Sequence, residues 1–194
     1  MKNLLLGMAA FLMLSINLDA QNYSRPTRIF KKGQTDIQIG YGLLTTASLM
    51  DKANTKFPPV SIRGDRFMSD NFSLGVSYTV ASNQGQPYII PDGLEQRITN
   101  TTHQLALRPT FHITTLKNID LYGGMMVGLN FEEYSVDRGN TSFLTEHKNF
   151  QPQRVKGIYS AFVGGRYVLS KRWSAFGEIG YSTSLLTIGM GYRI

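Results

Sequence analysis

Residues 72–82 read Phe-Ser-Leu-Gly-Val-Ser-Tyr-Thr-Val-Ala-Ser. From Phe72 to Val80 every second residue is apolar or aromatic, and the residues between them are Ser, Gly or Thr. Successive side chains of a β-strand point to opposite faces, whereas the apolar face of a helix repeats every three or four residues. The stretch therefore predicts a strand with one apolar face and one face of small polar residues.

The same alternation recurs along the chain. Seven further segments show it, at residues 35–44, 60–67, 103–113, 119–131, 155–168, 173–181 and 186–194. In 155–168 we expect Tyr159, Val163 and Tyr167 on one face and Ser160 and Arg166 on the other. Ile158 and Phe162 fit this pattern poorly, so the register of this strand stays open. The sequence thus predicts eight β-strands.

The connections between these segments alternate in length. Long connections are expected at 45–59, 83–100 and 132–154, about 15, 18 and 23 residues, and short turns at 68–71, 114–118 and 169–172. The last connection, near 182–184, is short where the pattern would place a long one. Strands joined one after another by turns of this kind indicate an antiparallel up-and-down barrel.

Two kinds of barrel have one apolar face: a secreted lipocalin-like carrier, with that face inward, and an outer-membrane barrel, with that face toward lipid. The polar face here also carries four acidic and four basic residues: Asp36, Arg63, Asp65, Arg108, Asp120, Arg166, Glu178 and Arg193. Inside a narrow barrel such charges can pair, which a buried charge requires. The interior is therefore expected to hold a charge network that plugs it.

Aromatic residues on the apolar face gather near the strand ends. Those expected on the long-loop side are Tyr41, Tyr78, Phe131 and Tyr181, and those on the short-turn side are Phe72, Phe111, Trp173 and Tyr192. Two such girdles are typical of barrels that span a bilayer. A lipocalin would also carry a C-terminal helix, which the sequence does not indicate. We therefore expect residues 34–194 to form an all-β, eight-stranded antiparallel up-and-down transmembrane β-barrel.

The first 20 residues have the pattern of a secretory signal peptide. Lys2 precedes a 15-residue apolar stretch, Leu4 to Leu18, and Ala20 offers a small residue for cleavage before Gln21. The apolar stretch is shorter than the roughly 20 residues of a membrane-spanning helix. Residues 21–33 then form a basic, aperiodic segment that we expect to be a periplasmic tail.

A family resemblance rests on three segments. Residues 187–194, Thr-Ile-Gly-Met-Gly-Tyr-Arg-Ile, look like the C-terminal insertion signal of outer-membrane barrels, with Thr187, Gly189, Tyr192 and Ile194 at its positions. Ile194 stands where many relatives have Phe. Residues 67–78 and 164–182 resemble the OmpA/OmpX type of small eight-stranded barrel. The resemblance implies the outer membrane of a Gram-negative cell, contact with membrane lipid and lipopolysaccharide, and insertion by the barrel-assembly machinery, but it names no activity.

Catalytic and cofactor chemistry has little support in the sequence. Cysteine is absent, and no metal-ligand spacing or phosphate-binding loop appears, so no cofactor is expected. An enzyme that modifies lipid A or phospholipid acyl chains is the alternative, with His147 in the longest loop or His103 near the outer rim as its base. Neither has a serine partner in a recognisable motif, and His112 is expected to bond interior groups.

The net charge of +7 does not indicate a nucleic-acid partner. Much of the excess falls on the tail, at Arg25, Arg28, Lys31 and Lys32, and the long loops are nearly neutral. The expectation is thus a monomeric barrel, not an enzyme, with a structural or surface-interaction role. Its three long loops would meet an unknown surface ligand.

Overall fold

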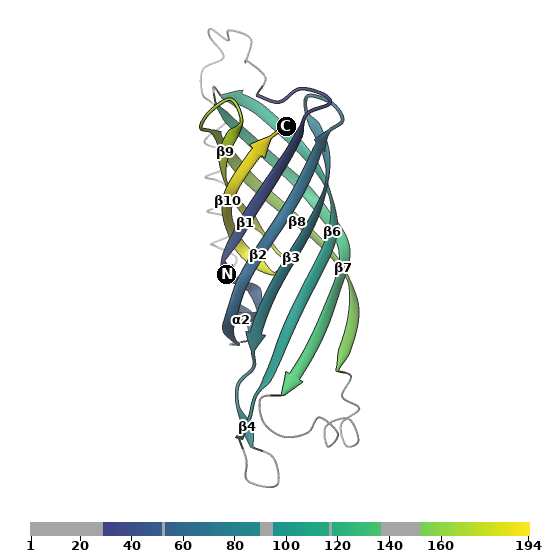
Figure 1. Ribbon diagram of the computed structural model, residues 1–194, viewed down its shortest axis with the longest axis vertical. Helices are drawn as coiled ribbons and strands as arrows, with labels where there is room; N and C mark the ends of the chain where they lie inside the picture. Colours follow the sequence, from purple (N-terminus) through teal and green to yellow (C-terminus); the bar gives the residue numbers. More distant parts are fainter. Residues whose placement is uncertain (1–28, 52, 90–94, 117, 137–151) are drawn as a thin grey trace, which may run out of the picture.

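The computed structural model describes residues 29–51, 53–89, 95–116, 118–136 and 152–194. Within these residues eight long strands close into an antiparallel barrel in the order β1-β10-β9-β8-β7-β6-β3-β2 (Figure 1). The strands are β1 (Thr35–Thr45), β2 (Asn54–Phe67), β3 (Phe72–Gln84), β6 (Ile98–Leu116), β7 (Ile119–Val136), β8 (Gln153–Val168), β9 (Trp173–Gly180) and β10 (Ser184–Arg193). The ladder between β1 and β10, from Asp36 opposite Arg193 to Thr45 opposite Ser184, closes the barrel.

The two ends of the barrel differ. One end, which we call the short-turn end, holds the tight turns after β2, β6 and β8 and the last residue, Ile194. The other, the long-loop end, holds the helix α2 (Thr46–Asp51) and the two-stranded sheet of β4 (Tyr88–Ile89) and β5 (Glu95–Gln96). Figure 1 shows β3, β6 and β7 extending farther toward β4 than β1 and β10 do. The rim of the long-loop end is therefore oblique.

The wall of the barrel follows the period of two. In β1 the side chains of Ile37, Ile39 and Tyr41 are exposed, while Asp36 and Gln38 between them are 1% and 2% exposed. The same holds for β3, where Leu74, Val76 and Tyr78 are exposed and the residues between them are buried. The apolar face is thus the outer surface, as a membrane barrel requires, and the polar face lines the interior. This arrangement excludes the lipocalin alternative.

A small hydrophobic cluster lies inside the barrel and settles the register of β8. Phe162 is 4% exposed and packs with Ala106, Tyr122 and Met126, with Ile158 against them. The two residues that fitted the alternation poorly are therefore inward-facing apolar side chains. Tyr159, Val163 and Tyr167 point outward, as expected.

Several strands are longer than their alternation indicates. β2 begins at Asn54 and not near Val60, because two irregularities in its ladder, between Thr55 and Phe57 and between Phe57 and Val60, disrupt the alternation. β6 begins at Ile98, five residues before the expected start at His103. The polar residues 99–102 belong to this strand because they pair with β3 on one side and with β7 on the other. The connections at this end are correspondingly shorter than expected, and most of the one between β7 and β8 lies outside the described residues.

Candidate functional site

The middle of the barrel is organised by Glu178 on β9. One of its oxygens, Oε2, accepts hydrogen bonds from Arg63 at 2.9 Å and from Arg108 at 2.6 Å, and the Tyr122 hydroxyl donates to it at 3.4 Å. The Arg108 guanidinium also lies 3.8 Å from the centroid of the Phe162 ring. All these groups are buried, so two arginines share one carboxylate in a low-dielectric interior.

A second cluster lies nearer the short-turn end. The Arg166 guanidinium is 3.0 Å from Asp36 Oδ2, an ion pair by distance without the geometry of a hydrogen bond. The Gln38 amide donates to Asp36 at 2.9 Å and to Asp65 at 2.6 Å and so holds the two carboxylates together. Acids and arginines from β1, β2 and β8 therefore form one connected group.

All eight charged residues that the sequence placed on the polar face of the strands lie on the inner face of the barrel wall. Seven of them are buried, and Arg193 is partly exposed. The sequence could give their face but not their pairing, because Arg63 and Glu178 are 115 residues apart and meet only through barrel closure.

Phe30 seals the short-turn end of this interior. Its ring is 2% exposed and stacks on Phe67, with centroids 4.5 Å apart and planes 4° from parallel. The guanidinium groups of Arg166 and Arg193 lie 4.7 and 4.3 Å from its centroid. Part of the segment expected to be an aperiodic tail is thus a structural element of the barrel, which sequence reasoning missed because one aromatic residue outside a strand carries no periodic signal.

His112 connects two further buried groups. Its Nε2 lies 2.9 Å from Ser73 Oγ, and its Nδ1 lies 2.9 Å from Asp120 Oδ2. The order Ser, His, Asp is that of a nucleophile, a base and an orienting acid. Ser73 and Asp120 are 0% exposed, however, and the Phe67 ring covers His112 at 4.7 Å between centroids.

Of the two histidines considered as catalytic bases, His103 near the outer rim and His147 in the longest loop, only His103 is among the described residues. His103 is inside β6 and not at its start, and its Nδ1 lies 2.7 Å from the outward-facing Tyr78 hydroxyl. His147 lies outside the described residues.

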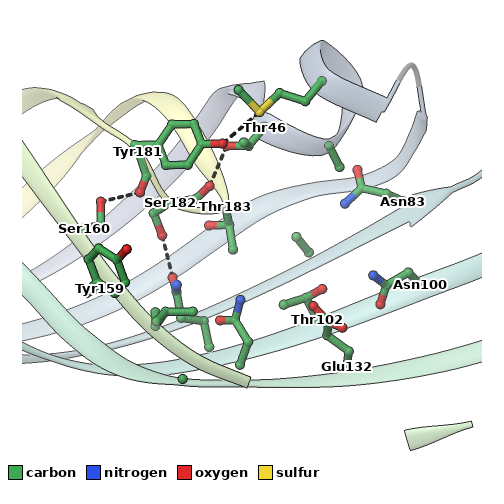
Figure 2. A pocket seen from close by; sticks show the side chains of 17 residues that line it. Thr46, Asn83, Asn100, Thr102, Glu132, Tyr159, Ser160, Tyr181, Ser182 and Thr183 are labelled. Carbon is green, nitrogen blue, oxygen red and sulfur yellow. Dashed lines mark hydrogen bonds between the residues drawn. The ribbon is translucent and has the colours of Figure 1, made fainter. Parts of the chain in front are cut away.

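The long-loop end of the interior holds a cavity of about 520 Å³. Figure 2 shows its two walls, with Asn83, Asn100, Thr102 and Glu132 on one side and Tyr159, Ser160 and Tyr181 to Thr183 on the other. Ser182 Oγ donates to Gln104 Oε1 at 2.8 Å across the cavity floor, and Thr46 on α2 donates to the Ser182 carbonyl at 2.5 Å. This cavity was not foreseen, because its lining comes from five elements and one connection that are separate in the chain.

Glu132 in this cavity is already partnered. Lys156 Nζ lies 2.8 Å from its Oε2, and the Tyr134 hydroxyl donates to the same oxygen at 2.8 Å. Glu132 therefore has both a cation and a hydroxyl donor on one of its oxygens.

The eight girdle aromatics lie on the outer face. Tyr41, Tyr78, Phe111, Phe131, Trp173 and Tyr181 are exposed, and Phe72 and Tyr192 are half-buried. Tyr159 and Tyr167 also face outward and were not included in the expected girdles. Among the four residues of the expected insertion signal, Thr187 and Gly189 lie in β10, Tyr192 packs edge-on against Trp173, and the Ile194 amide donates to Thr35.

In the described part of the chain, no group of three or more His, Cys, Asp or Glu side chains is arranged to hold a metal ion. No helix there is long and apolar enough to cross a membrane.

Comparison with solved structures identifies the fold. The outer-membrane protein OprG of Pseudomonas aeruginosa superposes with a TM-score of 0.51 at 13% identity, over 86% of this chain and 98% of that one. Ail of Yersinia pestis, solved in complex with the heparin analogue sucrose octasulfate, gives 0.49 at 14% identity over 84% and 99%, and neisserial surface protein A gives 0.46 at 14% over 83% and 94%. No family model and no curated protein matches the chain. The match to OprG confirms the fold of a small eight-stranded outer-membrane barrel.

Proposed function

We propose that the protein is an integral outer-membrane barrel that acts as a closed structural scaffold and meets its partner at the long-loop end. The observation that carries this proposal is the distribution of side chains: the outer wall is apolar and the interior holds paired charges, the reverse of a soluble protein. Exposure of that wall to water would destabilise a soluble barrel. In this proposal the short-turn end faces the periplasm and the long-loop end faces outward.

The interior contacts support a plug and not a conducting pore. Eight strands enclose a space that side chains can fill, and here arginines, carboxylates and Phe162 occupy the middle. Phe30 lies across the periplasmic end. In planar lipid bilayers we expect no open-channel conductance, and a stable ion conductance would overturn the plug.

The membrane assignment has a direct test. Purified outer-membrane fractions should contain the chain, and unboiled samples should migrate differently from boiled samples on a detergent gel, because a closed barrel resists mild detergent. Recovery in the soluble periplasmic fraction with unchanged mobility would overturn the assignment. Residues 1–20 as the signal peptide, lipopolysaccharide contact, assembly through the C-terminal signal and the monomeric state belong to the same proposal.

Acyl-chain chemistry is the second candidate, favoured by the alignment of Ser73, His112 and Asp120. Against it, a hydrolase must admit a substrate to its serine, and Ser73 is fully buried beneath the Phe30 and Phe67 rings that cover His112. We therefore assign these three residues to the interior network and not to catalysis.

A further inference from the structure

The cavity at the long-loop end differs from the rest of the interior in its chemistry. No arginine, lysine or histidine is among the described residues that line it, and its single carboxylate, Glu132, is paired with Lys156. Its volume of about 520 Å³ falls within the range of small-molecule sites, which is roughly 300–1,000 Å³. The cavity is therefore a space lined by both polar and apolar groups and without a cation, on the long-loop side of the charged interior groups.

Side-chain amides on one wall of the cavity have unused hydrogen-bonding capacity. Asn83 on β3 is the register partner of Asn100 on β6, and Asn130 on β7 is the register partner of Gln104. The Oδ1 atoms of the three asparagines are buried, and each lacks a hydrogen-bond partner among the described residues. Each amide offers one acceptor group and two donors. These oxygens have almost no accessible surface, so each amide must turn about its Cβ–Cγ bond to offer its oxygen to a ligand. A buried polar atom without a partner is costly, and that cost favours the turn when a ligand supplies a partner.

The charges decide which ligand fits. An anionic group would meet Glu132 and no cation from the lining, because Lys156 lies outside the lining and is already paired with that carboxylate. An apolar ligand would leave the three amides unsatisfied. A neutral molecule that carries many hydroxyl groups satisfies both conditions, because each hydroxyl both donates and accepts.

One edge of β8 beside the cavity is unpaired. β8 continues to Gln153, but its pairing with β9 stops at Phe162 opposite Gly180, so residues 153–161 have no partner strand on that side. Tyr159 and Tyr181, 86% and 53% exposed, flank this gap. Their rings offer flat apolar faces beside the cavity, and Tyr181 is one of the four aromatics expected in the girdle on the long-loop side.

We propose that this cavity binds a neutral sugar, a mono- or disaccharide, with Asn83, Asn100 and Asn130 as its hydrogen-bonding wall. The ligand enters past Tyr159 and Tyr181. The proposal rests on the outward orientation of the long-loop end and gives a ligand class to the surface-interaction role. Because the unpaired edge of β8 lies beside the outward-facing Tyr159 and Tyr181, the sugar comes either from solution or from the headgroup of a glycolipid.

The test uses the full barrel in phosphatidylcholine nanodiscs. Free maltose and N,N′-diacetylchitobiose are probed by saturation-transfer NMR, with glucose 6-phosphate as the anionic comparison. In a second arm the nanodiscs contain a monoglucosyl diacylglycerol, and native mass spectrometry measures its retention. Binding of a free sugar, or retention of the glycolipid alone, supports the proposal and identifies the source. Absence of both, or a preference for glucose 6-phosphate, overturns it.

The matched variants are Asn100→Leu and Asn130→Leu in the cavity and Asn54→Leu at the exposed start of β2. We expect each cavity variant to weaken binding roughly tenfold, the equivalent of one or two hydrogen bonds. The control should bind as the parent does.

A second measurement is the temperature at which the folded band disappears on the detergent gel. For the cavity variants this temperature should stay the same or rise, because they remove unpaired buried amides. A fall in that temperature with unchanged binding would show that the asparagines are structural and overturn the proposal. A barrel that failed to shift on the gel would instead contradict the membrane assignment.

Discussion

Arg108 and Glu178, 70 residues apart in the chain, meet in the middle of the barrel with 2.6 Å between Nη2 and Oε2. The same carboxylate oxygen accepts from Arg63, and both arginines are buried. Removal of one member of such a group leaves buried charge without compensation, which costs far more than loss of an exposed ion pair.

Glu178→Gln should therefore lower the free energy of unfolding by about 3–5 kcal/mol. Urea unfolding in detergent micelles, followed by the gel shift, measures it. The matched control is Lys156→Gln, which breaks a pair whose lysine is 42% exposed and should cost under about 1 kcal/mol. Equal effects of the two variants would contradict the role assigned to Glu178.

Phe30→Ala should destabilise the short-turn end. The substitution removes the ring that stacks on Phe67 and faces Arg166 and Arg193, and a buried Phe→Ala change costs about 3 kcal/mol or more. Lys32→Ala, at an exposed position whose backbone amide still donates to Asp70, is the control and should change stability by less than about 0.5 kcal/mol. Hydrogen exchange of the β3 and β6 amides near Ser73 and His112 should increase in the Phe30 variant alone, and unchanged exchange would show that Phe30 does not seal the barrel.

Val127→Arg tests which face meets lipid. Val127 points outward from β7 and is 53% exposed, and an arginine in the lipid-facing band costs about 2–4 kcal/mol near the bilayer midplane. We expect less folded protein in the outer-membrane fraction, measured as the unshifted proportion on the gel. Asn130→Arg, on the inward face of the same strand near the rim, should be milder. The reverse order would mean that the outer wall is not in contact with lipid.

Gly124→Ala tests how closely β6 and β7 pack inside the barrel. A methyl group at Gly124 would lie 2.8 Å from the Phe162 ring and would also clash with the Pro109 carbonyl. Overpacking of this kind costs about 1–3 kcal/mol. Gly177→Ala, whose added methyl meets nothing within 4 Å, should leave the unfolding midpoint in place. A midpoint shift of the same size in both variants would point to backbone propensity and not to packing.

Ser73 should not react with a fluorophosphonate probe. The hydroxyl is aligned with His112 and Asp120 but is 0% exposed, so the reagent has no access to it. A strain that carries Ser73→Ala should keep its lipid A and phospholipid acyl composition by mass spectrometry, and the variant barrel should lose about 1 kcal/mol of stability with its hydrogen bond. Labelling of Ser73, or altered acyl chains, would show that the protein is an enzyme that modifies acyl chains.

Much of the wall follows from local sequence. Alternation across residues 72–82 predicted both the existence of β3 and its outward face, and it did so for six other strands, whereas for β8 it predicted a strand and left the register open. The limits of the strands were harder to predict. At residues 98–102 the polar run Ile-Thr-Asn-Thr-Thr has no apolar alternation, and β6 extends through it because β3 and β7 lie on either side. The helix α2 was not expected either, because six residues are too few to show a helical period.

The sequence by itself determined which side chains share a face of most strands, because that grouping depends only on the alternation of neighbouring Cβ atoms along a strand. The structure shows that the apolar face is the outer one. The sequence could not determine which interior groups meet. The pairing of Arg63 with Glu178, the stacking of Phe30 on Phe67, the line of Ser73, His112 and Asp120, and the asparagine wall of the cavity all join residues that are distant in the chain. Their contacts depend on the register of each ladder and on the closure of β1 against β10, which fix the inner surface only when all eight strands are in place.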